Sequence, residues 1–133
     1  MVFLLSILFG VMPLMAQKSN GSAIQFEKKI HNYDTIMPGS DGECHFIYTN
    51  TGCEPLIITS VSSSCGCTTA GWNRSPLLPG QKGMIDVKYN TEISGSFQKT
   101  IVVKSNAANA PTSVLRIRGF VREKPKRQAK GRQ

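Results

Sequence analysis

Two cysteines separated by a single residue give this sequence its clearest chemical signal. Cys65 and Cys67 stand on either side of Gly66. Three kinds of chemistry suit such a pair: a disulfide, thiolate binding of a soft metal such as Cu(I) or Zn, and thiol-disulfide exchange. A closed zinc site needs four donors, which only Cys44 and His31 could help to complete, whereas Cu(I) tolerates two. We therefore expect no resident cofactor, with Cu(I) or Zn as the alternative.

Two further cysteines, Cys44 and Cys53, leave the pairing open, since four cysteines allow three complete sets of bridges. The strands expected on either side of Cys53 place it at the end of the domain opposite Cys65 and Cys67. Cys44 falls at the same end as that pair, so a bridge from Cys44 to one of them is one possibility. Direct closure of Cys65 onto Cys67 is the other, because a bend at Gly66 could bring their Cα atoms within about 7 Å.

The rest of the sequence holds no recognisable catalytic motif. It lacks a Gly-x-Ser-x-Gly elbow, a His-Glu-x-x-His zinc helix, a phosphate-binding glycine loop and a Cys-x-x-Cys pair. The two histidines are His31, expected in a loop, and His45, whose strand position faces away from its neighbour Cys44. No lysine or arginine flanks Cys65, although thiol exchange favours a cysteine pKa lowered by a nearby cation. We predict that the protein is not an enzyme.

The two ends of the chain differ in composition from its centre. Residues 1–16 carry no charge and contain an apolar run of signal-peptide length, shorter than the about 20 residues of a membrane span. Residues 122–133 hold six Lys or Arg and one Glu, and so five of the eight net positive charges. We predict a signal peptide at 1–16, a linker at 17–22 and a disordered basic tail at 122–133. The tail is either simply solvated or attracted to an anionic surface, and nucleic acid is not an expected partner of an exported protein.

Residues 23–121 are expected to form one domain of seven or eight short strands. In Glu43–Asn50 the alternation of side chains directs Cys44, Phe46 and Tyr48 to one face. Similar alternation gives inward-facing sets further along the chain, namely Ile85, Val87 and Tyr89, then Leu115, Ile117 and Val121, with Arg116 and Arg118 on the wet face.

The remaining segments complete the expected sandwich. The segments 23–28 and 33–36 are short enough to be edge strands, whereas the β-branched run 56–61 predicts a strand buried on most sides. Residues 72–78 are expected to be irregular. Short strands joined by Gly and Pro turns, without helical periodicity, predict an all-β immunoglobulin-like β-sandwich.

Several short motifs follow one another in the order that is typical of one bacterial family. They are Phe46–Gly52, Pro55–Ile58, Ser64–Thr68, Leu78–Gly80, Gly95–Ile101, Ser105–Asn106 and Ile117–Gly119. Over about Gln25 to Val121 the chain resembles the "domain of unknown function 1573" family, whose members are similar to the immunoglobulin-like domains of major sperm protein and Hydin-related proteins. Cys65 and Cys67 match motif cysteines, whereas Cys44 and Cys53 do not. The resemblance implies a fold and not an activity.

These observations predict an exported, non-enzymatic module of the periplasm or cell surface that binds a protein or another envelope component. Immunoglobulin-like domains carry recognition on loops or exposed sheet edges held by a rigid sandwich. The candidate binding loops are 62–79, with Ser64 and Trp72, and 107–111, next to Asn106. The alternative is a metal-binding or thiol-redox protein centred on Cys65 and Cys67.

Overall fold

The computed structural model describes residues 10–11 and 21–125, and these residues contain strands and turns but no helix. The strands are β1 (Ile24–Phe26), β2 (Ile30–Ile36), β3 (Glu43–Asn50), β4 (Ile58–Ser63), β5 (Thr68–Trp72), β6 (Lys82–Tyr89), β7 (Gly95–Ser105) and β8 (Thr112–Val121). Residues 1–9 and 12–20, which include most of the predicted signal peptide and linker, lie outside the described residues. Residues 126–133 of the predicted tail also lie outside them. In the described part, no helix is long and apolar enough to cross a bilayer.

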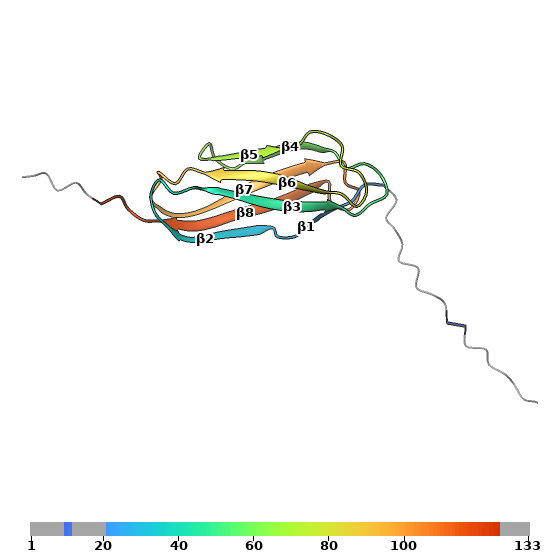
Figure 1. Cartoon of the computed structure of the whole chain (residues 1–133), viewed down its shortest axis with the longest axis horizontal. Helices are drawn as coiled ribbons and strands as arrows, with labels where there is room; N and C mark the ends of the chain where they lie inside the picture. Colours follow the sequence, from blue (N-terminus) through green and yellow to red (C-terminus); the bar gives the residue numbers. More distant parts are fainter. Residues whose placement is uncertain (1–9, 12–20, 126–133) are drawn as a thin grey trace, which may run out of the picture.

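The strands form two four-stranded sheets that pack face to face (Figure 1). The first sheet has the order β1-β3-β6-β5 and the second has the order β2-β8-β7-β4. All neighbouring strands are antiparallel except β2 and β8, which run parallel. The prediction of an immunoglobulin-like sandwich of seven or eight strands is therefore confirmed, and the expected edge positions of the first two strands are correct.

The core lies between the sheets and is built by the alternation read from the sequence. Cys44, Phe46 and Tyr48 of β3 are buried, and so are the alternating apolar residues of the other central strands: Ile85, Val87, Tyr89, Ile101, Val103, Leu115, Ile117 and Val121. Arg116 and Arg118 are exposed, as expected. Each strand therefore has one apolar face and one wet face, the pattern of antiparallel sheets that meet water on one side.

Gly119 makes room for a group of aromatic rings at one end of this core. The rings of Phe97 and Tyr89 stack with their centroids 3.8 Å apart, and Tyr33 lies 5.6 Å from Phe97. A Cβ atom on Gly119 would stand 2.9 Å from Phe97 and equally close to Tyr33. A side chain cannot fit there without moving a ring. The Ile117–Gly119 motif thus has a packing reason.

Three expectations about the strands were wrong. The run 56–61 was expected to be a strand buried on most sides, but β4 begins at Ile58 and is an edge strand. Ile57 just before it and Thr59 within it are exposed. β-branched residues favour any pleated, half-buried strand, so composition could not separate a central strand from an edge. His31 belongs to β2, where its ring contacts Tyr33, and not to a loop. Residues 62–79 were expected to form one binding loop, but residues 68–72 within this range form a strand, β5.

Candidate functional site

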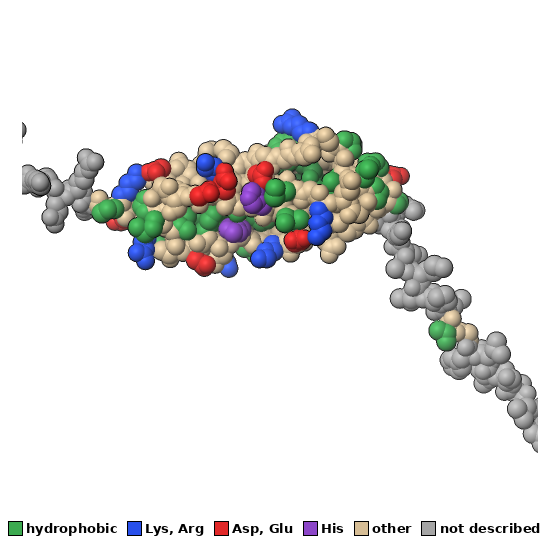
Figure 2. Space-filling view, viewed as in Figure 1, with side chains coloured by type: hydrophobic (Ala, Val, Ile, Leu, Met, Phe, Trp, Pro, Cys, Tyr) green, Lys and Arg blue, Asp and Glu red, His purple; other side chains and the backbone are tan. Residues whose placement is uncertain are grey.

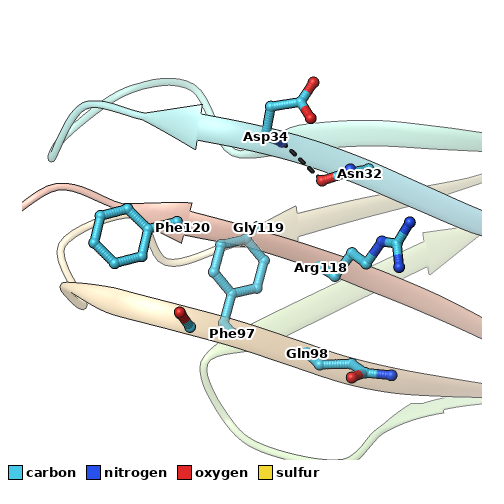
Figure 3. Close-up of a pocket in the computed structure, with 8 residues that line it drawn as sticks. Asn32, Asp34, Phe97, Gln98, Arg118, Gly119 and Phe120 are labelled. Atoms are coloured by element: carbon cyan, nitrogen blue, oxygen red, sulfur yellow. Dashed lines mark hydrogen bonds between the residues drawn. The ribbon is translucent and has the colours of Figure 1, made fainter.

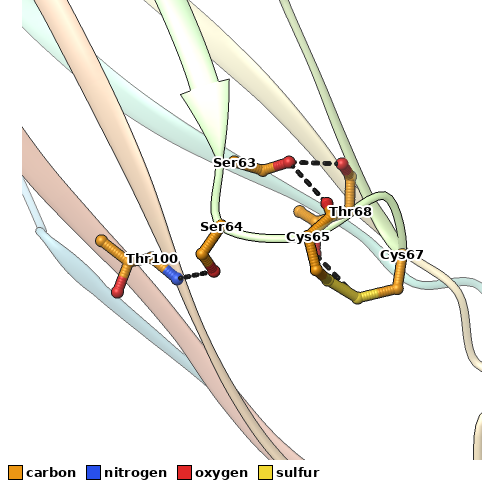
Figure 4. Close-up of a disulfide and its surroundings, with 6 residues drawn as sticks. All are labelled: Ser63, Ser64, Cys65, Cys67, Thr68 and Thr100. Carbon is orange, nitrogen blue, oxygen red and sulfur yellow. Dashed lines mark hydrogen bonds between the residues drawn. A yellow bond between two sulfur atoms is a disulfide. The ribbon is translucent and has the colours of Figure 1, made fainter.

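The turn between β4 and β5 carries the Cys-Gly-Cys motif and takes the chain from the second sheet to the first. Cys65 and Cys67 form a disulfide across Gly66, and their Cα atoms are 5.4 Å apart (Figure 4). Two fully extended residues would span about 7 Å, so the chain bends at Gly66 to close the bridge. Of the two pairings left open by the sequence, the structure has the direct one.

Hydrogen bonds hold this turn independently of the sulfur atoms. The Ser63 hydroxyl lies 2.8 Å from the carbonyl oxygens of both Cys65 and Thr68, which come from the two sides of the turn. The Ser64 backbone N–H donates to Thr100 O at 2.9 Å, and the Ser64 hydroxyl accepts from Thr100 N–H. On the other side, Asn90 N–H donates to Cys67 O at 2.8 Å. Both arms of the turn are thus fastened to neighbouring strands.

Ser64 had been expected to contribute to a binding loop. Although it is exposed, its backbone and hydroxyl are both engaged with Thr100 of β7. These bonds fasten the turn to β7, and the binding role of Ser64 stays a prediction.

The bridge itself contributes little to stability. A disulfide stabilises mainly by restricting the unfolded chain, and the restriction grows with the length of the closed loop. For the three residues closed here, the chain-entropy relation gives about 1.6 kcal/mol, against about 3 kcal/mol for a loop of 15 residues. A cross-link between residues two apart also joins no distant parts of the fold. Stabilisation is therefore a weak reason for its presence.

Cys44 takes no part in this bridge, contrary to one of the two expected pairings. Its side chain points into the core between the sheets, and only 4% of its surface is exposed. Burial raises the pKa of its thiol, and a hydrogen bond with the Tyr33 hydroxyl opposes that rise. A buried thiol with a raised pKa is a poor nucleophile and a poor metal ligand. Cys44 therefore acts as a small core residue.

The other cysteine, Cys53, lies far from the Cys-Gly-Cys turn, as the sequence predicted. It is exposed, and its Sγ lies 3.4 Å from the backbone nitrogen of Gly21. Within residues 10–11 and 21–125, no three His, Cys, Asp or Glu side chains are grouped as metal ligands. In the bridged state neither Cys65 nor Cys67 is a thiolate, which is the form that binds Cu(I) or Zn.

A lysine that the sequence analysis did not connect with the motif lies next to it. Lys88 of β6 pairs in register with Thr69 of β5, just beyond the turn. Lys88, Gly66 and Cys67 line one surface cavity of about 290 Å³ together with Thr69, Tyr89 and Asn90. Lys88 is 21 residues from Cys67 in the sequence, so only strand pairing brings this cation to the disulfide. The sequence search looked for flanking charges and missed it.

Beyond the Cys-Gly-Cys turn, β5 forms one edge of the first sheet. Asn90 N–H donates to Cys67 O, and the alternation of antiparallel bonding then directs the backbone groups of Ala70 and Trp72 away from β6. Within the described residues, no further strand lies beyond β5. β5 therefore presents backbone donors and acceptors at the side of the sandwich.

The other three edge strands carry features that discourage pairing with another chain. β1 has only three residues. β2 has an irregular register between Asn32 and Thr35, where Asp34 adopts a positive φ of 55°. β4 has a register shift between Ile58 and Ser60. β5 has no shift along its five paired positions and contains no charged residue or proline. Short length, bulges and charges protect sheet edges, so β5 is the least protected of the four.

Next to this edge, the outer face of the first sheet is polar. His45 lies on the face opposite Cys44, as predicted, and its Nδ1 is 2.6 Å from Asp86 Oδ1. Gly71 stands in register with Asp86 on the side of the free edge, and nothing lies within 4 Å of where a Gly71 Cβ would be. A hollow of about 410 Å³ extends over these residues. Figure 2 shows acidic and basic side chains beside the two histidines on one face of the molecule.

Trp72 and Asn106, two predicted binding residues, both have contacts within the domain. The Trp72 ring packs against the core and under the Arg74 guanidinium, 4.7 Å from the ring centroid. The Asn106 amide donates to Pro55 O at 3.1 Å and accepts from Ile57 N–H at 2.8 Å. Asn106 therefore ties together two loops.

Another surface hollow lies on the outer face of the second sheet. It measures about 530 Å³ and is lined by residues of β2, β7 and β8, with Arg118, Gln98 and Phe120 around it (Figure 3). It is shallow, and Asp34 and Arg118 are both among the residues that line it. This hollow is separate from the Cys-Gly-Cys turn.

With this geometry established, the chain can be compared with known proteins. The model of a family described as "Protein of unknown function (DUF1573)" matches residues 24–121. The chain belongs to the DUF1573 family. This confirms the resemblance noted in the sequence, and the matched range spans all eight strands. No curated protein gives a significant match.

Solved structures support the immunoglobulin-like fold. A protein of unknown function from Porphyromonas gingivalis W83 has a TM-score of 0.69 at 15% identity, over 80% of this chain and 50% of its own. The PapD-like domain 7 of human CEP192 has a TM-score of 0.65 at 14% identity, over 93% and 99% of the two chains. The VesB protease of Vibrio cholerae has a TM-score of 0.60 at 16% identity, over 74% of this chain and 31% of its own.

The matched structures differ in how much of them this chain covers. It spans half of the Porphyromonas gingivalis protein and 31% and 23% of the two Vibrio cholerae proteases VesB and VesC. At these identities the likeness shows the fold alone, because immunoglobulin-like sandwiches host many unrelated functions.

Proposed function

We propose that this DUF1573 domain is an exported, non-enzymatic binding module that takes an extended segment of another envelope protein onto the free edge of β5. The observation that carries the proposal is the regular, uncharged edge of β5, where Ala70 and Trp72 direct backbone groups outward. A partner strand placed there would continue the first sheet through main-chain hydrogen bonds. The periplasmic chaperone SfaE, whose structure has a TM-score of 0.50 at 10% identity, is in keeping with a protein-binding role.

The face beside this edge indicates which side chain the partner segment carries. Since Gly71 has no side chain, the Asp86 carboxylate is open to a residue of the incoming strand on the outer face. Asp86 is 59% exposed and bonded on its far side to His45. A lysine or arginine of the partner would find a carboxylate there, in addition to the main-chain bonds of the edge. We therefore expect a segment with a basic residue facing outward.

The edge is tested with the full chain and two substitutions at Ala70. Ala70→Pro removes the outward N–H, which an edge strand tolerates structurally, whereas Ala70→Ser retains it. We expect partners cross-linked in the native envelope to be lost with Ala70→Pro and retained with Ala70→Ser. In hydrogen exchange, the isolated partner should protect the amides of Ala70 and Trp72. Protection confined to another edge or to loops, or equal capture by both variants, would overturn the proposal.

The basic residue of the partner is tested separately at Asp86. Asp86→Asn keeps the shape of the side chain and removes its charge, so affinity for the partner should fall by about two- to fivefold, as expected for one exposed ion pair. Asp41→Asn, a change at an exposed acidic residue in the turn before β3, serves as the matched control. Equal affinities of the Asp86 variant and the parent would remove the basic residue from the proposal while leaving the edge intact.

Export is tested by the N-terminal sequence of the protein recovered from its native host. The signal-peptide prediction places the first residue of the mature chain at Gln17. A protein that begins at Met1 and is found inside the cell would contradict it.

A further inference from the structure

The Cys65–Cys67 bridge combines three properties that separate it from a structural disulfide. It closes only three residues and so constrains the unfolded chain little. Both cysteines are partly exposed, and Gly66 between them is exposed, so a reagent can reach the sulfur atoms. A cation, Lys88, lines the same cavity as Cys67. Exposed disulfides are the labile, regulatory or catalytic ones, whereas structural bridges resist reduction.

The backbone would keep the two cysteines close together after reduction. Ser63, Ser64 and Asn90 fasten the turn through bonds that involve no sulfur atom. The Cα separation of 5.4 Å lies within the range from which a disulfide forms without backbone movement. A pair of thiols held in this way can close again whenever an oxidant is present. The turn therefore has the arrangement of a reversible pair, in which each cysteine can resolve a bond made by the other.

We propose that the Cys65–Cys67 disulfide is a thiol-disulfide exchange site that oxidises dithiols of exported proteins. A substrate thiolate attacks Cys67 Sγ, the Cys65–Cys67 bond breaks, and Cys65 leaves as a thiolate. The second substrate thiolate then attacks the substrate sulfur of this mixed disulfide and releases Cys67. The substrate gains a disulfide and loses two electrons and two protons, and Cys65 and Cys67 become thiols. A disulfide such as oxidised glutathione restores the bridge by the reverse sequence.

Lys88 and the cavity assign the two cysteines different roles. Cys67 lines the cavity with Lys88 and Asn90, whereas Cys65 does not line it. An incoming thiolate is an anion, so the ammonium group of Lys88 favours its approach on this side. The Thr68 hydroxyl, 4.0 Å from Cys67 Sγ, stands next to the reacting atom. Cys67 is therefore the sulfur that is attacked, and Cys65 is the leaving thiolate. This activity does not depend on the binding edge of β5, and it would add an oxidoreductase function to a module that is otherwise proposed to act by binding alone.

The proposal is tested on the full chain in millimolar mixtures of reduced and oxidised glutathione. Samples are quenched with acid and alkylated, and mass spectrometry then reports the state of the cysteines. Circular dichroism measures whether the fold is retained. We expect Cys65 and Cys67 to equilibrate with glutathione within minutes while the sandwich stays folded. Reduction that proceeds only as the protein unfolds, or a bridge that resists glutathione in the native state, would overturn the proposal.

Variants test the assigned roles. With oxidised glutathione, the Cys65→Ser variant should accumulate glutathione on Cys67. In the Lys88→Gln variant, which keeps both cysteines, reduction of the Cys65–Cys67 bridge by glutathione should be about two- to fivefold slower, the effect of one exposed charge. Lys104→Gln, which removes an exposed lysine from β7, is the matched control and should leave the rate unchanged. Equal rates of bridge reduction in the parent, Lys88→Gln and Lys104→Gln proteins would overturn the role of Lys88. A model protein with two reduced cysteines should gain its disulfide from the oxidised chain, and failure to do so would overturn dithiol oxidation.

Discussion

Two turns of this domain carry the chain from one sheet to the other, and different interactions hold them. Asn50 to Pro55 leads from β3 towards β4, and Ser64 to Cys67 leads from β4 to β5, so both carry the chain from one sheet to the other. At the first, the Asn50 amide is fully buried and donates to Glu54 O at 2.7 Å and to Leu77 O at 2.9 Å. At the second, serine hydroxyls and a disulfide lie at the surface.

The difference in burial between the two turns separates a turn that stabilises the fold from a turn that can react. A buried amide has no access to water or reagents, and its loss removes the hydrogen bonds that hold the turn. The Cys-Gly-Cys turn is exposed, and its sulfur atoms can change state while its hydrogen bonds persist. The first turn stabilises the sandwich, and the second is free to carry chemistry.

The largest expected effect is at the buried turn. Asn50→Ala removes both donors and also the acceptor used by Gly52 N–H at 3.0 Å. We expect a loss of about 3 kcal/mol in the free energy of unfolding, because three hydrogen bonds of a buried side chain are removed and each contributes about 1 kcal/mol. Urea denaturation measures it. Asn106→Ala, a similar but exposed bonding residue, should cost only about 1 kcal/mol. Equal losses for the two would show that burial does not distinguish them.

The packing around Gly119 should give the next largest effect. Gly119→Ala places a methyl group against the ring of Phe97 and the Cβ atom of Tyr33, so we expect a loss of about 2 kcal/mol from overpacking. Gly66→Ala is the matched control at the reactive turn, since a Cβ there meets nothing within 4 Å. Thermal unfolding of both variants measures the contrast. An unchanged melting temperature for Gly119→Ala would contradict the packing role of this glycine.

The disulfide should matter less to stability than either of these sites. We expect the double variant Cys65→Ser/Cys67→Ser to lose no more than about 1.5 kcal/mol, the loop-closure contribution of so short a bridge. Its circular dichroism spectrum should match that of the parent. A loss above about 3 kcal/mol, typical of bridges that close long loops, would erase the contrast between the two turns.

The smallest effect concerns pH and His31. Burial, with a contribution from Lys28, lowers the pKa of His31, and Asp34 opposes the shift. The unfolded chain then binds a proton more readily than the folded one as pH falls below the usual value of 6.5. Stability from this residue is therefore present at neutral pH and declines as the pH falls below 6.5. His31→Gln should flatten this part of the pH profile of the melting temperature. An unchanged profile would contradict the shift.

Much of the fold could be predicted from local patterns. The alternation around Cys44 and Phe46 is strong because one face of β3 is buried, and it remains visible in the sequence whatever lies across the core. The family motifs predicted the same sandwich. The pattern failed for β4 and β5 at the side of the sandwich, where burial is partial and the pattern of apolar residues weakens.

Only part of the candidate site could be predicted from the sequence. The sequence by itself determined that Cys44 faces the core, and that Cys65 and Cys67 could bridge each other if the chain bends at Gly66. Only the tertiary structure decided that they bridge each other, that Lys88 shares their cavity, and that β5 has a free edge beside Asp86. The physical reason is that strand pairing joins residues far apart in the chain, and neither register nor edge position is encoded in the local spacing of residue types.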